Sequence, residues 1–196
     1  MKRLVLASSN RGKLDELQPL LGEAGFELVR QVDLGVSDAI EDGLTFVENA
    51  LIKARHACRA TGLPALADDS GLVVDALEGA PGLLSARYAG VHGDSAGNNH
   101  KLLAELQGLP ESRRTARFVA VLVLLRHAED PLPLIAQGVW EGRVLDAPRG
   151  TKGFGYDPVF FDPLLGRSAA ELEPELKNRV SHRGQALAKL RELLAC

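Results

Sequence analysis

The sequence has few cysteines, no excess of positive charge and no long run of apolar residues. Its two cysteines, Cys58 and Cys196, stand far apart and form no CxxC or Cys/His cluster, which argues against a disulfide framework or a zinc site. The net charge of −3 argues against the broad basic face that nucleic-acid binding requires. The longest apolar run, residues 118–125, is too short to cross a bilayer, and residues 4–7 are too short for a signal-peptide core. We therefore expect a soluble cytoplasmic protein that binds neither membranes nor nucleic acid.

The remaining composition is that of an ordinary globular protein. Hydrophobic residues make up 45% and charged residues 25% of the chain, which excludes a disordered or collagen-like class. A chain of 196 residues is long enough to bury a substantial core in one domain. Since there is no internal repeat, linker or low-complexity tract, we expect a single domain over residues 1–196.

Hydrophobic spacing predicts alternating strands and helices. Residues 4–7 read as a short buried strand, and Leu14, Leu17 and Leu21 then recur at helical spacing. A Thr45/Glu48 capping box predicts a helix that starts at Phe46 and closes near residues 62–64. Further expected elements are a long loop over 79–93, a helix over 99–106, a central strand over 118–125 paired with 134–140, a strand over 159–161, a Ser168/Glu171 capping box and a last helix capped by Ser181. This alternation is typical of an α/β fold.

A candidate phosphate loop joins the first strand to the first helix. It consists of Ser8, Ser9, Asn10, Arg11, Gly12 and Lys13. The free N–H groups and dipole of a helix N-terminus favour phosphate, and Lys13 adds a positive charge. The segment is not a Walker A loop, because it lacks the first glycine and the Ser or Thr after the lysine. On its own, a plain polar turn explains it equally well.

Two pairs of acidic residues are candidate metal ligands. Glu41–Asp42 precedes a predicted helix, and Asp68–Gly71 is predicted at a break between extended segments over 65–67 and 72–77. Carboxylate oxygens suit Mg²⁺, which usually takes only one or two protein carboxylates and keeps several waters. Lys53, on the predicted helix, could add a cation. Two solvated acidic turns and an exposed lysine are the alternative interpretation.

Two later segments could bind a nucleotide base. Gly150–Pro158 combines flexible glycines with Phe154, Tyr156 and one acid, the components needed to hold a flat ring and hydrogen-bond its edge. Ser181–Gly184 opens the last helix and could place His182 and Arg183 against a base or phosphate. A glycine-rich turn before a strand, and an N-cap with a solvated arginine, are the alternatives.

These segments together carry a resemblance that outweighs the separate interpretations. The sequence resembles the inosine/xanthosine triphosphate pyrophosphatase family, also called HAM1-like or RdgB-like. The matching motifs follow the family's order over nearly the whole chain and are Ser8-x-Asn10-x-x-Lys13, Glu41 with Gly43-Leu44-Thr45-Phe46-x-Glu48-Asn49-Ala50, Ala67-Asp68-Asp69-Ser70-Gly71-Leu72, Gly79-Ala80-Pro81-Gly82, Ser85-Ala86-Arg87-Tyr88, Gly153-Phe154-Gly155-Tyr156-Asp157-Pro158 and Ser181-His182-Arg183-Gly184-Gln185-Ala186-Leu187.

The resemblance implies a fold, an activity and a set of site residues. It implies an α/β protein with a long mixed central sheet, flanking helices and two lobes around a substrate cleft, forming a homodimer. It implies hydrolysis of aberrant purine triphosphates such as ITP, dITP and XTP to the monophosphate and pyrophosphate, which keeps them out of DNA and RNA. Its implied site residues are Ser8 to Lys13, Lys53 and Ser70 for the phosphates, Glu41 and Asp69 for Mg²⁺, Asp69 also as the base, Asp68 in support, and Phe154, Gly155, Tyr156, Asp157, Lys177, His182 and Arg183 for the nucleotide and its base.

Two other functions remain open at this point. A Maf-like nucleotide pyrophosphatase resembles this family in fold but prefers other nucleotides, and the segments over 154–157 and 181–183 argue against it. A nucleotide-sensing module without catalysis is the second alternative, and the presence of Glu41 and Asp69 argues against that.

Overall fold

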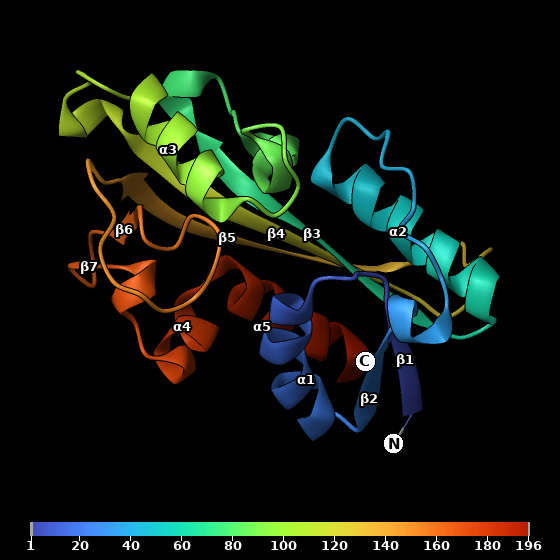
Figure 1. Ribbon diagram of the computed structural model, residues 1–196. Helices are drawn as coiled ribbons and strands as arrows, with labels where there is room; N and C mark the ends of the chain where they lie inside the picture. Colours follow the sequence, from blue (N-terminus) through green and yellow to red (C-terminus); the bar gives the residue numbers. More distant parts are fainter. Residues whose placement is uncertain (1, 196) are drawn as a thin grey trace. The chain divides into compact units, whose positions relative to one another are not determined.

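The computed structural model describes residues 2–195, apart from the side chain of Leu20 (Figure 1). The strands are β1 (Lys2–Leu6), β2 (Phe26–Arg30), β3 (Ala65–Val74), β4 (Thr115–Leu125), β5 (Leu134–Val144), β6 (Phe160–Asp162) and β7 (Arg167–Ser168). The α-helices are α1 (Arg11–Glu23), α2 (Phe46–Thr61), α3 (Ser95–Glu105), α4 (Pro174–Val180) and α5 (His182–Ala195). Cys196 lies outside the described residues, and Cys58 is a buried free thiol.

The strands form one mixed seven-stranded sheet in the order β2-β1-β3-β4-β5-β6-β7. The pairs β1/β2 and β1/β3 are parallel, whereas β5/β6 and β6/β7 are antiparallel. Parallel neighbours need a crossover connection, and helices α1 and α2 supply the connections before β2 and β3. The predicted α/β fold with a mixed central sheet and flanking helices is confirmed.

The chain divides into two compact units. Unit 1 comprises residues 1–69, 120–138 and 185–196, and unit 2 comprises residues 70–119 and 139–184. The strands β3, β4 and β5 each contribute residues to both units. The prediction of one domain over residues 1–196 stays a prediction.

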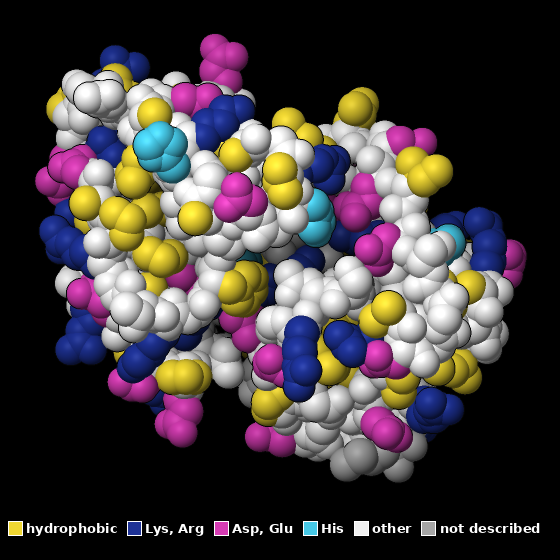
Figure 2. Space-filling model, in the orientation of Figure 1, with side chains coloured by type: hydrophobic (Ala, Val, Ile, Leu, Met, Phe, Trp, Pro, Cys, Tyr) yellow, Lys and Arg dark blue, Asp and Glu magenta, His cyan; other side chains and the backbone are white. Residues whose placement is uncertain are grey.

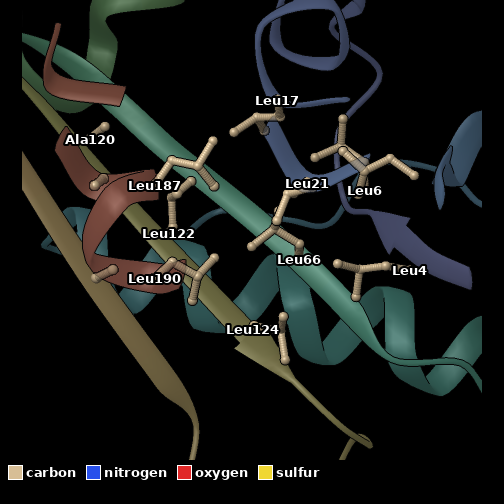
Figure 3. Packing of buried hydrophobic residues seen from close by; sticks show 13 residues of the cluster. Leu4, Leu6, Leu17, Leu21, Leu66, Ala120, Leu122, Leu124, Leu187 and Leu190 are labelled. Atoms are coloured by element: carbon tan, nitrogen blue, oxygen red, sulfur yellow. The ribbon is translucent and has the colours of Figure 1, made fainter. Parts of the chain in front are cut away.

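Unit 1 has a leucine-rich core on one face of its part of the sheet. Figure 3 shows leucines of α1 and α5 pointing toward leucines of the strands, and Figure 1 shows α2 on the opposite face from α1 and α5. Successive side chains of a strand point to opposite faces. Leu66 of β3 belongs to this core, so Asp68 faces the same side as Leu66, and Asp69 faces the side of α2. The sheet's alternation therefore separates the two neighbouring carboxylates.

Unit 2 has a second core that is richer in aromatic side chains. Phe118, Trp140 and Phe160 pack together, with ring centroids of Phe118 and Phe160 4.5 Å apart. Leu102 and Leu106, from α3 and its C-terminal end, are fully buried in the same core. Tyr156, from the glycine-rich segment, belongs to the same core.

The local signals for helices in the sequence are confirmed. Thr45 caps α2 and Ser181 caps α5, each accepting a backbone N–H with its hydroxyl. The predicted central strand over 118–125 is the larger part of β4, and its predicted partner is β5. The Ser168/Glu171 capping box is present and begins a short 3₁₀ helix.

Two predictions about irregular segments were wrong. Asp68–Gly71 is no break, because β3 runs without interruption from Ala65 to Val74. Ion pairs with lysines neutralise the carboxylates there, so they can stay in a buried strand. The expected long loop over 79–93 contains a 3₁₀ helix at Gly82–Arg87, whose Ser85 hydroxyl donates to the Gly82 carbonyl.

The surface carries charges of both signs. On the face drawn in Figure 2, Lys and Arg side chains are interspersed with Asp and Glu side chains. Among residues 2–195, none of the helices is both long enough and apolar enough to cross a bilayer.

Candidate active site

Two lysines from different helices meet at the Asp68 carbonyl of β3 in unit 1. The Lys13 ammonium donates to this oxygen at 2.9 Å, and the Lys53 ammonium donates to it at 3.1 Å. Lys13 comes from the first turn of α1 and Lys53 from the middle of α2, on opposite faces of the sheet. The strand thus brings together two cations that are far apart in the sequence.

Asp68 holds Lys13 in place. Its carboxylate lies 2.8 Å from the Lys13 ammonium and has no exposed surface, while the lysine side chain is 14% exposed. A buried carboxylate in direct contact with an ammonium is a fixed counter-charge. Asp68 therefore fixes the position of the lysine ammonium, and its supporting role in catalysis stays a prediction.

Asp69 and Glu41 share the Lys53 ammonium. The ammonium lies 2.6 Å from Asp69 Oδ1 and 3.3 Å from Glu41 Oε2. Burial raises the pKa of Asp69, and the neighbouring Lys53 charge opposes that shift. Burial lowers the pKa of Lys53, but the charges of Asp69 and Glu41 outweigh it, so the pKa is raised. The result is a charged lysine beside a carboxylate whose basicity is increased.

The loop that carries Glu41 is attached to the start of α2. The Asn49 side-chain oxygen accepts from Gly43 N at 2.9 Å, and Glu48 Oε2 accepts from Leu44 N. A Cβ at Gly43 would come within 2.7 Å of the Asn49 side-chain oxygen, so only glycine fits here. Asn49 lies in the quoted motif, but the sequence did not predict its positioning role.

The Ser8–Lys13 segment is organised by its own side chains. The Asn10 side chain caps α1 by accepting from Lys13 N, and the Ser8 hydroxyl accepts from Asn10 N. The Ser9 hydroxyl donates to Asp38, a residue that no local signal had marked. Arg11 and Gly12 form the first turn, where backbone N–H groups have no partner within the helix. Such a turn can accept an anion.

The carboxylates on the α2 side fit a magnesium ion. Glu41 and Asp69 offer oxygens to one shared cation, here the Lys53 ammonium. In residues 2–195, no three His, Cys, Asp or Glu side chains gather into a metal-binding group. Two carboxylates match Mg²⁺, which completes its coordination with water and substrate phosphates, better than they match a metal that needs a full protein cage.

In unit 2, two cations flank the ring of Phe154. The Lys177 ammonium lies 5.0 Å and the Arg183 guanidinium carbon 5.8 Å from the ring centroid. The lysine and arginine are buried, whereas Phe154 is 39% exposed. An exposed aromatic face beside cationic donors can stack a flat ring and hydrogen-bond its edge.

Asp157 is buried and fixes this group. Its Oδ2 accepts from the Lys177 ammonium at 2.7 Å and from Phe154 N at 2.8 Å. Gly153 has a φ of +74°, and a Cβ there would collide with this carboxylate. The glycine-rich segment is therefore folded tightly around Asp157.

The remaining residues of the segment anchor it to its surroundings. Tyr156 is buried, and its hydroxyl donates to the Ser85 carbonyl at 2.9 Å. Asn99 of α3 donates to the Gly155 carbonyl at 3.0 Å. Neither Ser85 nor Asn99 was predicted as a site residue, since nothing in their local sequence indicates these distant contacts.

The residues at the start of α5 point in different directions. The Arg183 guanidinium donates to the Ser70 hydroxyl at 3.0 Å, and Ser70 directly follows Asp69 in the chain. His182 is buried, and its ring stacks on the Phe118 ring with the two ring centroids 4.7 Å apart. Arg183 therefore belongs to the polar group around Phe154, and His182 packs against the aromatic core.

The predicted site residues are thus divided between the two units. Unit 1 holds those predicted for phosphate and metal, namely Ser8, Ser9, Asn10, Arg11, Gly12, Lys13, Glu41, Lys53 and Asp69. Unit 2 holds Ser70, which was predicted for the phosphates, and the residues predicted for the nucleotide and its base, namely Phe154, Gly155, Tyr156, Asp157, Lys177, His182 and Arg183. Their individual roles stay predictions.

Comparison with known proteins covers almost the whole chain. Residues 4–193 match the Ham1 family. A dITP/XTP pyrophosphatase of Xylella fastidiosa is 62% identical over 194 residues, which is 99% of this chain and 98% of that protein. A dITP/XTP pyrophosphatase of Vibrio cholerae is 55% identical over 97% of this chain and 95% of that protein. The solved structure of a HAM1 protein from Coxiella burnetii has a TM-score of 0.91 and 51% identity, and the match covers 100% of this chain and 99% of that one.

Proposed function

Because the chain belongs to the Ham1 family, we propose that it hydrolyses aberrant purine nucleoside triphosphates such as ITP, dITP and XTP to the monophosphate and pyrophosphate. The observation that carries this proposal is the convergence of Lys13 and Lys53 on β3, beside a buried carboxylate of raised pKa. Such an arrangement offers cations for phosphates and a base for water. Hydrolysis removes these nucleotides from the pool that supplies DNA and RNA synthesis.

Asp69 is the proposed base. Water attacks the α-phosphorus, pyrophosphate leaves, and Asp69 takes the proton that the water loses. Burial raises the pKa of Asp69, and a higher pKa makes the carboxylate a stronger proton acceptor.

The positive groups of unit 1 bind the triphosphate in this proposal. Lys13 and Lys53 neutralise the negative charge that grows on the leaving pyrophosphate, and the N–H groups of Arg11 and Gly12 donate to phosphate oxygens. Asp68 holds Lys13 in its working position. The segment from Ser8 to Asn10 keeps the helix start open to the anion.

Magnesium is the proposed cofactor, held by Glu41 and Asp69. When bound, it would supply positive charge to the phosphate oxygens. The Asn49 side chain keeps the Glu41 loop in place. Excess chelator is therefore expected to abolish pyrophosphate release, and added Mg²⁺ to restore it.

The Phe154 group is proposed to read the base. Inosine and xanthine offer an acceptor at O6, where adenine offers a donor. Lys177 and Arg183 are donors, so they match O6 and oppose the adenine amino group. The expectation that Asp157 helps to hydrogen-bond the edge of the base stays a prediction. Its Oδ2 accepts from the Lys177 ammonium and from Phe154 N, so we propose that it also positions those two groups.

The proposal extends to cellular setting and assembly. We infer a cytoplasmic enzyme that acts as a homodimer on free nucleotides and binds neither nucleic acid nor membranes. The mixed surface charge and the net charge of −3 support the expectation that polyanions are not partners.

A substrate panel tests the proposed function. Pyrophosphate release is measured with ITP, dITP, XTP, GTP, ATP and pyrimidine triphosphates, each with and without Mg²⁺. The expected result is rapid release from ITP, dITP and XTP with Mg²⁺ and slow release from ATP. Binding of ITP without release would indicate a nucleotide sensor, and preference for other nucleotides would indicate a Maf-like specificity.

A further inference from the structure

The Lys53 ammonium lies where two proposed metal ligands converge. It contacts Asp69 Oδ1 at 2.6 Å and Glu41 Oε2 at 3.3 Å, and it also donates to the Asp68 carbonyl at 3.1 Å. An ammonium has three protons to donate, and these three oxygens match that number. The Lys53 side chain is only 11% exposed, so water does not replace these partners easily.

We propose that Lys53 is an internal cation that fills the metal position of the nucleotide-free protein, so that nucleotide and metal bind together. The inference rests on the proposed function, because that function assigns Glu41 and Asp69 to Mg²⁺. Magnesium binds oxygen at about 2.0–2.1 Å. An ion ligated by both carboxylates would therefore stand against the ammonium that contacts the same two oxygens, and Lys53 must leave them.

Charge explains why Lys53 stays until a nucleotide arrives. The cluster in unit 1 holds two lysine ammonium groups and three carboxylates. A divalent ion entering alone would give this mostly buried cluster an excess of positive charge, which a low-dielectric surrounding disfavours. A triphosphate brings several negative charges. Its oxygens offer the Lys53 ammonium new acceptors, and the flexible side chain of Lys53 lets the ammonium reach them.

The consequence is a coupling between the two ligands. A nucleotide that draws Lys53 away raises the affinity for the metal, and by linkage the metal raises the affinity for the nucleotide by the same factor. Lys53 thereby prevents the metal from being held without a substrate. Lys13 has a different place in the cluster, because Asp68 on the opposite face of β3 holds it.

The wild-type protein gives the first test. Mn²⁺ serves as the probe. The electron paramagnetic resonance signal of free Mn²⁺ gives its Kd for the protein with and without a non-hydrolysable α,β-methylene analogue of ITP, after the Mn²⁺ bound by the analogue alone, measured in a protein-free titration, is subtracted. The expected result is weak binding to the protein alone and at least 100-fold tighter binding with the analogue. Equally tight binding in both conditions would overturn the proposal.

Two variants at one position give the second test. Lys53→Met removes the cation, so Mn²⁺ should bind the nucleotide-free variant at least tenfold more tightly than wild type, and the effect of the analogue should shrink. Lys53→Arg is the matched control, because it keeps a cation beside the carboxylates and should keep Mn²⁺ binding weak. A Lys53→Met protein that binds Mn²⁺ no more tightly than wild type, or no more tightly than Lys53→Arg, would contradict the inference.

The same samples separate this inference from the proposed function. Circular dichroism checks that each variant is folded. The Mn²⁺ test on the wild-type protein does not depend on the folding of any variant. If wild type shows the Mn²⁺ coupling but releases no pyrophosphate from any triphosphate, the proposed function fails and Lys53 keeps its role. If wild type releases pyrophosphate but binds Mn²⁺ tightly without nucleotide, the function stands and the role of Lys53 is rejected.

Discussion

At the scale of single residues, the site depends on how neighbouring carboxylates are partnered. Asp68 and Asp69 are adjacent, yet one contacts a lysine of α1 and the other a lysine of α2. Spacing in the sequence cannot distinguish two adjacent acids. The alternation of a strand distinguishes them, since it points them to opposite faces.

Replacing Asp69 tests its role as the base. Asp69→Asn should lower kcat for ITP by roughly 10²–10⁴-fold, because the carboxamide cannot take a proton from water. Circular dichroism should show an unchanged fold. Asp75→Asn, at an exposed position just after the end of β3, is the matched control and should keep near-normal turnover. Near-normal turnover in Asp69→Asn would reject the assignment.

Replacing Lys13 should affect both stability and activity. Lys13→Met leaves the buried Asp68 carboxylate without this ammonium, a loss of about 3–5 kcal/mol in the free energy of unfolding. Adding Asp68→Asn should restore part of that stability, since a neutral side chain needs no counter-charge, but should restore no activity. Urea unfolding and kcat/KM measure the two effects. Activity should fall by a similar factor for every nucleotide, and a defect confined to one base would remove Lys13 from the phosphate site.

Replacing Arg183 tests how the base is selected. Arg183→Ala should lower the ratio of kcat/KM for ITP to kcat/KM for ATP. The reason is that the Arg183 donor faces an acceptor in ITP and a donor in ATP, and two donors that face each other in a buried site cost about 1–3 kcal/mol. Arg179→Ala, at an exposed arginine in α4, is the control and should leave the ratio unchanged. Equal losses for ITP and ATP in Arg183→Ala would show that this residue does not read the base.

At the scale of elements, local sequence signals were enough to predict the helices but not the continuity of β3. The Thr45 and Ser181 caps and the spacing of leucines depend on residues a few positions apart, and these helices are present. The continuity of β3 through Asp68 and Asp69 depends on Lys13 and Lys53, which no local pattern connects with it. For the same reason the anchoring contact of Asn99 was not predictable.

The turn between β4 and β5 offers a test at this scale. Buried Asp130 accepts hydrogen bonds from the Arg126 side chain and from the backbone N–H groups of Arg126 and Leu132. Asp130→Asn should lower the free energy of unfolding by about 1–3 kcal/mol at pH 7. Glu129→Gln, a neighbouring exposed acid, is the matched control and should change it little.

The pH dependence of this effect has a definite sign. The hydrogen bonds from Arg126 hold the pKa of Asp130 well below its usual value. A carboxyl whose folded pKa is lowered stabilises the fold above its unfolded pKa of about 3.9 and loses that contribution as the pH falls toward the folded pKa. The difference between wild type and Asp130→Asn should be constant near neutral pH and shrink below about pH 4. A difference that grows on acidification would contradict this account.

At the scale of the whole molecule, the order of motifs along the chain was more informative than any single motif. The fold class and the family followed from seven motifs in one order, and the match of residues 4–193 to the Ham1 family agrees with them. The strand order and the assignment of residues to the two units could not be predicted, since they depend on contacts between distant segments.

The position of bond cleavage tests the central claim most directly. ITP is hydrolysed in water enriched in ¹⁸O, and mass spectrometry locates the label in the products. The account predicts IMP carrying one ¹⁸O together with unlabelled pyrophosphate, because water attacks the α-phosphorus. Label in pyrophosphate, or release of IDP and inorganic phosphate, would contradict it.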